Sequence, residues 1–233
     1  MEFQGRQIIV TGGTGTLGLA VVGALTAAGA TCHIPYINLD DAQISPFKGR
    51  TDVRLIPSVD LTDTSQVETL FAGVANLWAS IHIAGGFAYG ALAKTDPKIL
   101  RQQIDINLMT CLLCCRSAID VMCKQGQGGR IVNVAARSGL EWRQGANMAT
   151  YAAAKAAVAA LTVALAEEVV ESRILVNAVA PSIIDTAANR AEMPKADFAK
   201  WPKPEEIAKT ILFLASPKNL VTRGAVVPVY GRA

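Results

Sequence analysis

The sequence is poor in charged and aromatic residues, and this scarcity argues against several classes of protein. Only 18% of its 233 residues are charged and 6% are aromatic, whereas 51% are hydrophobic. The net charge of +3 comes from scattered lysine and arginine without a basic run, so nothing indicates a nucleic-acid or anionic-membrane partner. A charged fraction below the usual ~25% fits a protein that buries subunit interfaces.

Long apolar segments and targeting signals are also missing. No apolar run reaches the ~20 residues that span a bilayer. The N-terminus, MEFQGRQIIV, resembles a cap before a strand rather than a charged region before a signal segment. We therefore expect a cytoplasmic protein, and its length suits one domain with a substantial core.

Metal ligands are scarce, and the number of cysteines is odd. The five are Cys32, Cys111, Cys114, Cys115 and Cys123. The run Cys111-x-x-Cys114-Cys115 could be imagined as a metal or redox site, but it lies in a long apolar helical pattern with no second ligand pair, and the chain has only two histidines. We expect buried free thiols that pack as small hydrophobic side chains, and no metal site.

Short apolar strands alternate with helices along the whole chain. We expect strands over residues 7–11, 30–36, 53–57, 79–84, 129–135, 173–179 and 225–229. We expect helices over 19–28, 65–71, 97–124 and 204–216, and another that Tyr151 opens and that continues to residue 172. This alternation, without linker or repeat, predicts a single-domain doubly wound α/β Rossmann fold, with a seven-stranded parallel sheet and helices on both faces.

Residues 187–203 form a long connection between the last expected helix and the strand before it. Connections of this length in a compact domain are usually functional, often lids. Met193, Phe198 and Trp201 are candidates for the apolar wall of a substrate site, and the alternative is simple packing of the segment onto the domain.

Gly12, Gly15 and Gly18 stand between the first expected strand and the first expected helix. In this context Gly12 permits a tight turn, Gly15 lets backbone N–H groups approach a pyrophosphate, and Gly18 allows the helix to pack closely on the strand. The spacing predicts a dinucleotide-binding turn.

The residues that would select between NAD and NADP leave the choice open. At the end of the second strand, an acidic residue favours a free ribose 2′-hydroxyl and a basic one favours a 2′-phosphate. Tyr36 is neither, and Asp40 and Asp41 come late in the following loop. Asp60, after the third strand, either accepts from the adenine amino group or closes an N-cap or Asx turn before the next helix.

Tyr151 and Lys155 are four residues apart, so on a helix their side chains emerge on one face. A nearby ammonium stabilises a phenolate and lowers its pKa from ~10, which makes tyrosine usable as a general acid or base. The pair also arises often by chance, so its meaning depends on the rest of the chain.

Together these motifs resemble the short-chain dehydrogenase/reductase family over nearly the whole chain. The glycine loop, the aspartate, Ala-Gly after strand four, a helical asparagine, Tyr-x-x-x-Lys and Pro-x-x-Ile-x-Thr follow the family order. The resemblance implies hydride transfer between nicotinamide and a carbonyl or alcohol. It implies a cofactor site of Gly12, Thr14, Gly15, Thr16, Leu17, Gly18, Tyr36, Asp60, Leu61, Ala84, Gly85, Gly86, Tyr151, Lys155, Pro181, Ile184 and Thr186.

The resemblance also implies catalytic roles. Tyr151 would protonate the carbonyl oxygen or act in reverse, while Lys155 would lower the pKa of Tyr151 and bind the nicotinamide ribose. Asn107 would anchor a water relay to Lys155, and Thr186 would hold the nicotinamide carboxamide. The helices that carry Asn107 and Tyr151 pair between subunits in this family, which implies a homodimer or homotetramer.

Three features depart from the family pattern. Thr16 stands where many members have glycine, and His82 begins a segment where the family has Asn-Asn-Ala-Gly; we interpret His82 as a packed strand residue. The serine that polarises the substrate carbonyl falls on Ser138 when counted back from Tyr151, and on Ala136 when counted along strand five. Both positions stay open, and the alternative for Ser138 is a turn residue.

A narrower resemblance concerns residues 188–201, which look like the same segment of dihydropteridine reductase. That enzyme also has Ala-Gly-Gly before an aromatic residue, as at 84–87 here, and lacks the serine. It reduces a quinonoid imine, but it carries an acidic residue where Tyr36 stands. A quinonoid pterin reductase is therefore the second hypothesis, and a non-catalytic dinucleotide-binding sensor or scaffold is the third.

Overall fold

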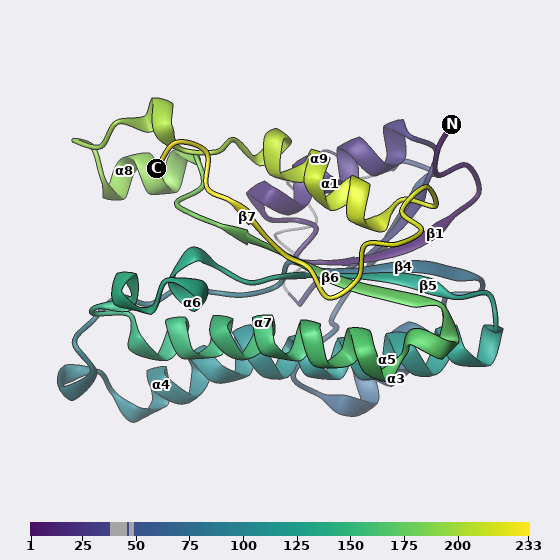
Figure 1. The fold of residues 1–233 in the computed structure, drawn as a ribbon, viewed down its shortest axis with the longest axis horizontal. Helices are drawn as coiled ribbons and strands as arrows, with labels where there is room; N and C mark the ends of the chain where they lie inside the picture. The colour runs from purple at the N-terminus through teal and green to yellow at the C-terminus, as the bar shows by residue number, and fades with distance from the viewer. Residues whose placement is uncertain (38–45, 47–48) are drawn as a thin grey trace.

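A seven-stranded, fully parallel sheet forms the centre of the molecule (Figure 1). The computed structural model describes residues 1–37, 46 and 49–233. The strands are β1 (Gln7–Thr11), β2 (Thr31–Pro35), β3 (Val53–Ile56), β4 (Leu77–His82), β5 (Gly129–Val134), β6 (Ile174–Pro181) and β7 (Val226–Val229). Their order is β3-β2-β1-β4-β5-β6-β7, which confirms the expected doubly wound fold. The order reverses between β1 and β4, and such a switch point opens a crevice at the carboxyl ends of the strands.

Helices cover both faces of the sheet. The helices α1 (Thr16–Ala27) and α9 (Pro204–Ala215) pack together on one face, and α3 (Thr64–Ala72), α5 (Thr110–Gln125) and α7 (Ala149–Glu168) lie on the other (Figure 1). The shorter α6 (Arg137–Leu140) and α8 (Ala187–Glu192) follow β5 and β6, at the carboxyl end of the sheet. Single turns of 3-10 helix occur at Leu92–Lys94, Trp142–Gly145, Val170–Ser172 and Phe198–Lys200.

The helix expected over residues 97–124 is three helical segments in sequence. The segment α4 (Pro97–Ile104) passes into a π-helical turn, η2 (Asp105–Met109), and then into α5. A π turn holds one extra residue, so it rotates the side chains that follow, and such turns occur frequently at functional sites. Hydrophobic periodicity alone does not reveal that extra residue.

Two other boundaries differ from expectation. Helix α1 begins at Thr16, three residues before the expected start, because Gly15 in an extended conformation serves as its N-cap. Residues 187–203 hold α8 and a 3-10 turn rather than an irregular connection.

The core lies in two layers, one on each face of the sheet. Leu25 and Ile211 belong to the layer beneath α1 and α9, whereas Phe71 and Met122 belong to the layer beneath α3, α5 and α7. Every residue of β4 and β5 is buried, as expected of strands that helices cover from both sides.

Two helical stretches are long and apolar enough to span a membrane, contrary to the expectation from the sequence. They are Pro97–Gln125 and Ala149–Glu168. Both bury one side against the sheet, as the core helices of many α/β proteins do. Length and hydropathy alone therefore do not make them membrane spans.

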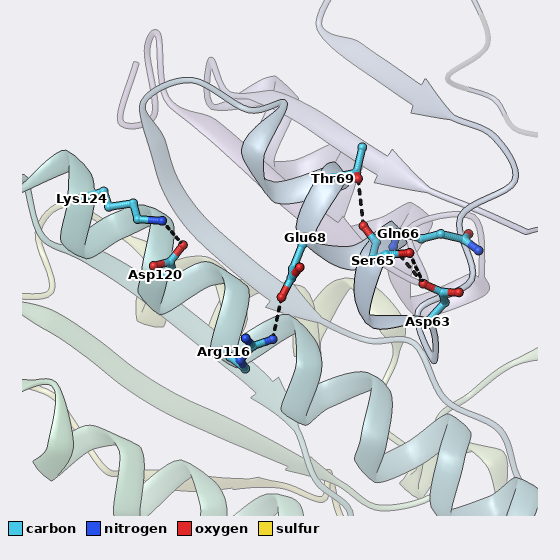
Figure 2. A network of polar contacts seen from close by, with 8 residues as sticks. All are labelled: Asp63, Ser65, Gln66, Glu68, Thr69, Arg116, Asp120 and Lys124. Carbon is cyan, nitrogen blue, oxygen red and sulfur yellow. Dashed lines mark hydrogen bonds and ion pairs between the residues drawn. The ribbon is translucent and has the colours of Figure 1, made fainter.

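Helix α3 begins with a polar network that also reaches α5 (Figure 2). Asp63 caps α3: its Oδ1 accepts from the Gln66 backbone N–H at 3.0 Å and from Ser65 Oγ at 2.7 Å. Arg116 on α5 pairs with Glu68 on α3 at 2.8 Å. More than half of each of these side chains is exposed, so the ion pair contributes at most ~1 kcal/mol.

Candidate active site

Tyr151 and Lys155 lie side by side near the start of α7, facing the end of β5. Lys155 is buried, and its Nζ donates to the Val134 carbonyl at 2.8 Å. The same Nζ is 5.9 Å from the centre of the Tyr151 ring. Phe87 packs edge-on against that ring, with 5.1 Å between centroids. The two side chains therefore hold the adjacent positions that their spacing predicts.

Burial moves both pKa values of this pair. It lowers the pKa of Lys155 to about 8 and raises the pKa of Tyr151 to about 12. The expected lowering of the Tyr151 pKa is therefore wrong for this arrangement, because removal of the phenolate from water dominates. At neutral pH Tyr151 carries its proton, as a proton donor must.

Asn107 lies in the π turn, with its amide held by backbone. Its Nδ2 donates to the carbonyls of Gly86 at 2.8 Å and Gln103 at 3.0 Å, and its Oδ1 accepts from the Gly86 N–H at 3.2 Å. A Cβ at Gly85 would lie 2.7 Å from Asn107 Oδ1 and 3.5 Å from Lys155 Nζ. Gly85 thus lies against both side chains, and the structure brings Asn107 and Lys155 together. The water relay stays a prediction.

The glycine turn between β1 and α1 has the shape that a pyrophosphate requires. Gly12 has φ +68°, and a Cβ there would lie 2.7 Å from the Ala84 nitrogen. A Cβ on Gly18 would collide with the carbonyl oxygen of Gly12. A Cβ on Gly15 would lie 3.4 Å from that Gly12 oxygen, which is an ordinary contact. No side chain caps α1, so its first N–H groups remain for an anion. These residues fit a dinucleotide.

The other expected cofactor residues lie at the carboxyl ends of their strands. Tyr36 directly follows β2, and Asp40 and Asp41 lie outside the described residues. Asp60 Oδ1 accepts from the Thr62 N–H at 2.8 Å and from Thr62 Oγ1 at 2.7 Å, an Asx turn that leaves its other oxygen for a ligand.

On the opposite side of the switch point, the segment after β6 holds the remaining positions. Pro181 ends β6, and Ile184 packs against the core beneath α1 and α9. Thr186 Oγ1 caps α8 by accepting from the Asn189 N–H at 3.1 Å. The cap fixes the position of the Thr186 hydroxyl, and its contact with a carboxamide stays a prediction.

Ala136 and Ser138 occupy different elements. Ala136 continues the extended chain after β5 and is the N-cap of α6, two residues after the carbonyl that binds Lys155. Ser138 is buried inside α6. That helix packs tightly on α7, because a Cβ at Gly139 would lie 2.6 Å from the backbone of Lys155. The strand-end position is therefore an alanine.

A pocket of about 280 Å³ adjoins Tyr151. Its lining includes Tyr89, Leu92, Gln103 and Met148, none of which the sequence singled out. Tyr89 and Leu92 precede α4, Gln103 lies within it and Met148 precedes α7, and only these places along the chain could have drawn attention to them. A second cavity, of about 400 Å³, lies beside α3 and has His33, Gln66 and Leu70 among its lining residues.

Met193, Phe198 and Trp201 are not among the residues that line the pocket beside Tyr151. Phe198 and Trp201 pack on each other at 5.0 Å between ring centres, and Trp201 is buried. Arg232 binds the same segment, since its guanidinium donates to the Ala199 carbonyl at 2.9 Å. Packing onto the domain, the alternative to a substrate wall, is what the structure shows for Trp201.

His82 is buried at the end of β4 and both ring nitrogens have partners. Nε2 lies 2.7 Å from Ser80 Oγ and Nδ1 lies 2.8 Å from Asn133 Oδ1. The interpretation as a packed strand residue fits this environment. The spacing of two residues between Ser80 and His82 places both on one face of β4, but Asn133, the partner of His82 Nδ1, lies 51 residues further along the chain.

The cysteines divide into three groups. Cys32 and Cys114 are buried among apolar side chains, as expected, and burial raises the pKa of Cys32 to about 12. Cys123 is exposed, so its expected burial is wrong. Cys111 and Cys115 are buried but contact Asn133 through their sulfur atoms, so they do not pack merely as small hydrophobic groups.

The chain is similar to known proteins over almost its whole length. A family model described as enoyl-(acyl carrier protein) reductase matches residues 13–231. A galactitol 2-dehydrogenase from Rhizobium johnstonii is 32% identical and covers 98% of this chain and 95% of its own. An acetoacetyl-CoA reductase from Shinella zoogloeoides is 31% identical, and the match covers 97% of this chain and 97% of that enzyme. A solved short-chain type dehydrogenase/reductase from Mycobacterium ulcerans, 25% identical, superposes with a TM-score of 0.89 over 100% of this chain and 90% of that one.

Proposed function

Because the chain belongs to the short-chain dehydrogenase/reductase family, whose members are NAD(P)-dependent enzymes, we propose that it interconverts a carbonyl and an alcohol on a small or medium organic molecule. The observation that carries the proposal is the pair formed by Tyr151, beside a pocket, and the buried ammonium of Lys155 behind it.

The dinucleotide would bind across the switch point of the sheet. The first N–H groups of α1 would hold its pyrophosphate, and the glycines at 12, 15, 85 and 86 would let it lie against backbone. When bound, the nicotinamide supplies or accepts the hydride. The protein's task is to orient the reactants and to move the proton.

Tyr151 would give its proton to the carbonyl oxygen during reduction and take it back during oxidation. The high pKa of its phenol keeps the proton in place until the oxygen develops negative charge. Lys155, anchored on the Val134 carbonyl, would place a positive charge near the forming phenolate. Asn107, bonded to Gly86, would hold the loop after β4 against this pair.

Loss of NADH or NADPH absorbance with a panel of ketones and aldehydes tests the proposal. Tyr151→Phe should lower turnover by ~10² or more while the affinity for the dinucleotide stays unchanged. Phe87→Leu is a control, because it removes the contact between the Phe87 and Tyr151 rings but leaves the Tyr151 hydroxyl proton in place. If Tyr151→Phe turned over substrate at the wild-type rate, the assigned role of Tyr151 would be wrong. If the wild type bound the dinucleotide but turned over no substrate, the result would favour a sensor.

A quinonoid pterin is the second candidate substrate. One structural observation supports it: of the two positions counted for a carbonyl-polarising hydroxyl, the one directly after β5 is Ala136, which has no hydroxyl, and the other, Ser138, is a buried residue of α6. A quinonoid imine needs less polarisation than a ketone. Fast turnover of quinonoid dihydropterin with no activity on the carbonyl panel would select this alternative.

We also propose that the enzyme is a homodimer or homotetramer. The outer side of α7 exposes Val163 by 46%, and the π turn exposes Met109 by 37%, so both helices offer apolar surface to a partner. Light scattering at micromolar concentration is the test, and a monomer would contradict the proposal.

A further inference from the structure

Four buried side chains with metal-binding atoms converge beneath α5, apart from Tyr151 and its pocket. Cys111 and Cys115 lie one helical turn apart on α5, and their thiols face the sheet. His82 on β4 and Asn133 on β5 are register partners directly below them. The four residues are at most 6% exposed, so water does not provide the polar contacts that these groups require.

Three distances within this cluster are close to the edges of a tetrahedral zinc site. Cys115 Sγ is 3.5 Å from His82 Nδ1, and Asn133 Oδ1 is 3.4 Å from Cys111 Sγ and 3.5 Å from Cys115 Sγ. The donor atoms of the two cysteines and the histidine all lie within 4.8 Å of one another. Bond lengths of about 2.3 Å to sulfur and 2.0–2.1 Å to nitrogen or oxygen give a tetrahedron with edges of about 3.4–3.8 Å.

The contact between His82 and Asn133 has to lengthen for an ion to enter. His82 Nδ1 and Asn133 Oδ1 are 2.8 Å apart, and they would separate by about 0.6 Å to become two corners of such a tetrahedron. A small rotation of either side chain achieves this separation, since the imidazole ring of His82 and the amide of Asn133 can each turn about the Cβ–Cγ bond.

Both non-sulfur ligands are already oriented from behind. Ser80 Oγ contacts His82 Nε2 at 2.7 Å, which leaves Nδ1 to point at the thiols. Asn133 Nδ2 donates to Thr162 Oγ1 at 3.0 Å, and that hydroxyl donates to the Val158 carbonyl at 2.8 Å. Hydrogen bonds of this kind fix the orientation of metal ligands in established sites.

Without a cation, the cluster brings too many donors to one oxygen. The His82 Nδ1–H and the S–H groups of Cys111 and Cys115 would all point at Asn133 Oδ1, which has two lone pairs. A divalent ion bound to two thiolates replaces those thiol protons and leaves no net charge in the interior, where an unpaired charge would be costly.

We propose that Cys111, Cys115 and His82, with Asn133 Oδ1 as the fourth donor, bind a thiophilic divalent cation of the Zn²⁺ class. With four protein ligands and no open position, the site is structural rather than catalytic. The ion ties α5 to β4 and β5, and it enters as the chain folds because the ligands are buried. Binding releases the two thiol protons and requires the neutral His82 tautomer with its proton on Nε2, where Ser80 Oγ can accept it, so affinity rises with pH.

Cobalt substitution tests the proposal on the whole chain. Wild-type protein is unfolded and refolded under reducing conditions with Co²⁺ or Zn²⁺, and the metal content of the desalted protein is measured. We expect one Co²⁺ per chain, with thiolate-to-cobalt charge-transfer and tetrahedral ligand-field absorption, and displacement of both signals by Zn²⁺. Zn²⁺ should also raise the melting temperature.

Two variants and one matched control locate the site. Cys111→Ser and Cys115→Ser should each lower Zn²⁺ affinity by at least about tenfold and weaken the charge-transfer band. Cys114→Ser is the control, because Cys114 is buried on the same helix but packs in the apolar core. Its metal content and spectrum should equal those of the wild type.

The wild-type spectrum decides the question by itself if a serine variant does not fold. Refolded wild type without bound cobalt, or with cobalt that lacks thiolate charge transfer, would overturn the proposal. So would loss of the signal in Cys114→Ser with its retention in Cys111→Ser. The readouts are metal content and spectra, so they are independent of the proposed activity.

Discussion

Gly85→Ala is the substitution that most directly tests how the candidate active site is held together. Gly85 is exposed and does not adopt a left-handed conformation, so alanine fits its backbone. The added methyl group would lie 2.7 Å from Asn107 Oδ1, closer than side chains approach one another, and 3.5 Å from Lys155 Nζ. Asn107 must therefore move.

The expected effects follow from the bonds that Asn107 would lose. Its two hydrogen bonds with Gly86 each contribute about 0.5–1.5 kcal/mol, so their loss should lower the free energy of unfolding by about 1–3 kcal/mol. The effect on turnover should be larger than that on stability, because a displacement of about 1 Å at a reacting centre lowers a rate by ~10².

Chemical denaturation and steady-state turnover at saturating dinucleotide measure the two effects. Gly73→Ala is the matched control: it lies at the end of α3, and an added Cβ would meet its nearest neighbours at 3.4 and 3.5 Å. This control should be neutral or more stable by about 0.4–1 kcal/mol. If Gly85→Ala behaved like Gly73→Ala in both assays, the Asn107–Gly86 contact would not be what positions the site.

Three further predictions use other parts of the structure. Turnover in the direction of reduction should fall as pH rises through about 8, because burial lowers the pKa of Lys155 to about 8 and the side chain loses its charge above that pH. A rate that stays constant up to pH 10 would contradict the role of the ammonium. Gly18→Ala should lower the free energy of unfolding by about 1–3 kcal/mol, measured by denaturation, because its methyl group collides with the backbone of Gly12. Ser138→Ala should leave turnover unchanged in the absorbance assay because Ser138 lies inside α6, and a loss of ~10² would instead identify it as the donor to the carbonyl.

The order of residues along the chain was enough to predict the fold and to suggest an outline of the candidate site. Seven apolar strands alternating with helices permit few arrangements other than a doubly wound parallel sheet, because right-handed crossovers restrict how such units connect. The glycines at 12, 15 and 18 and the pair Tyr151 and Lys155 are local patterns. Local patterns can be recognised from the sequence because their spacing sets which side chains share a turn or a helix face.

The environment of those residues depends on packing between segments that are distant along the chain. The pKa of Tyr151 rises rather than falls because packing of distant segments around the phenol removes it from water. The extra residue of the π turn at Asn107 leaves no trace in hydrophobic periodicity. His82 meets Cys115 only because β4 and α5 pack face to face, across 33 residues of sequence. Contacts between elements far apart in the chain follow from packing, and a pattern read along the chain does not contain them.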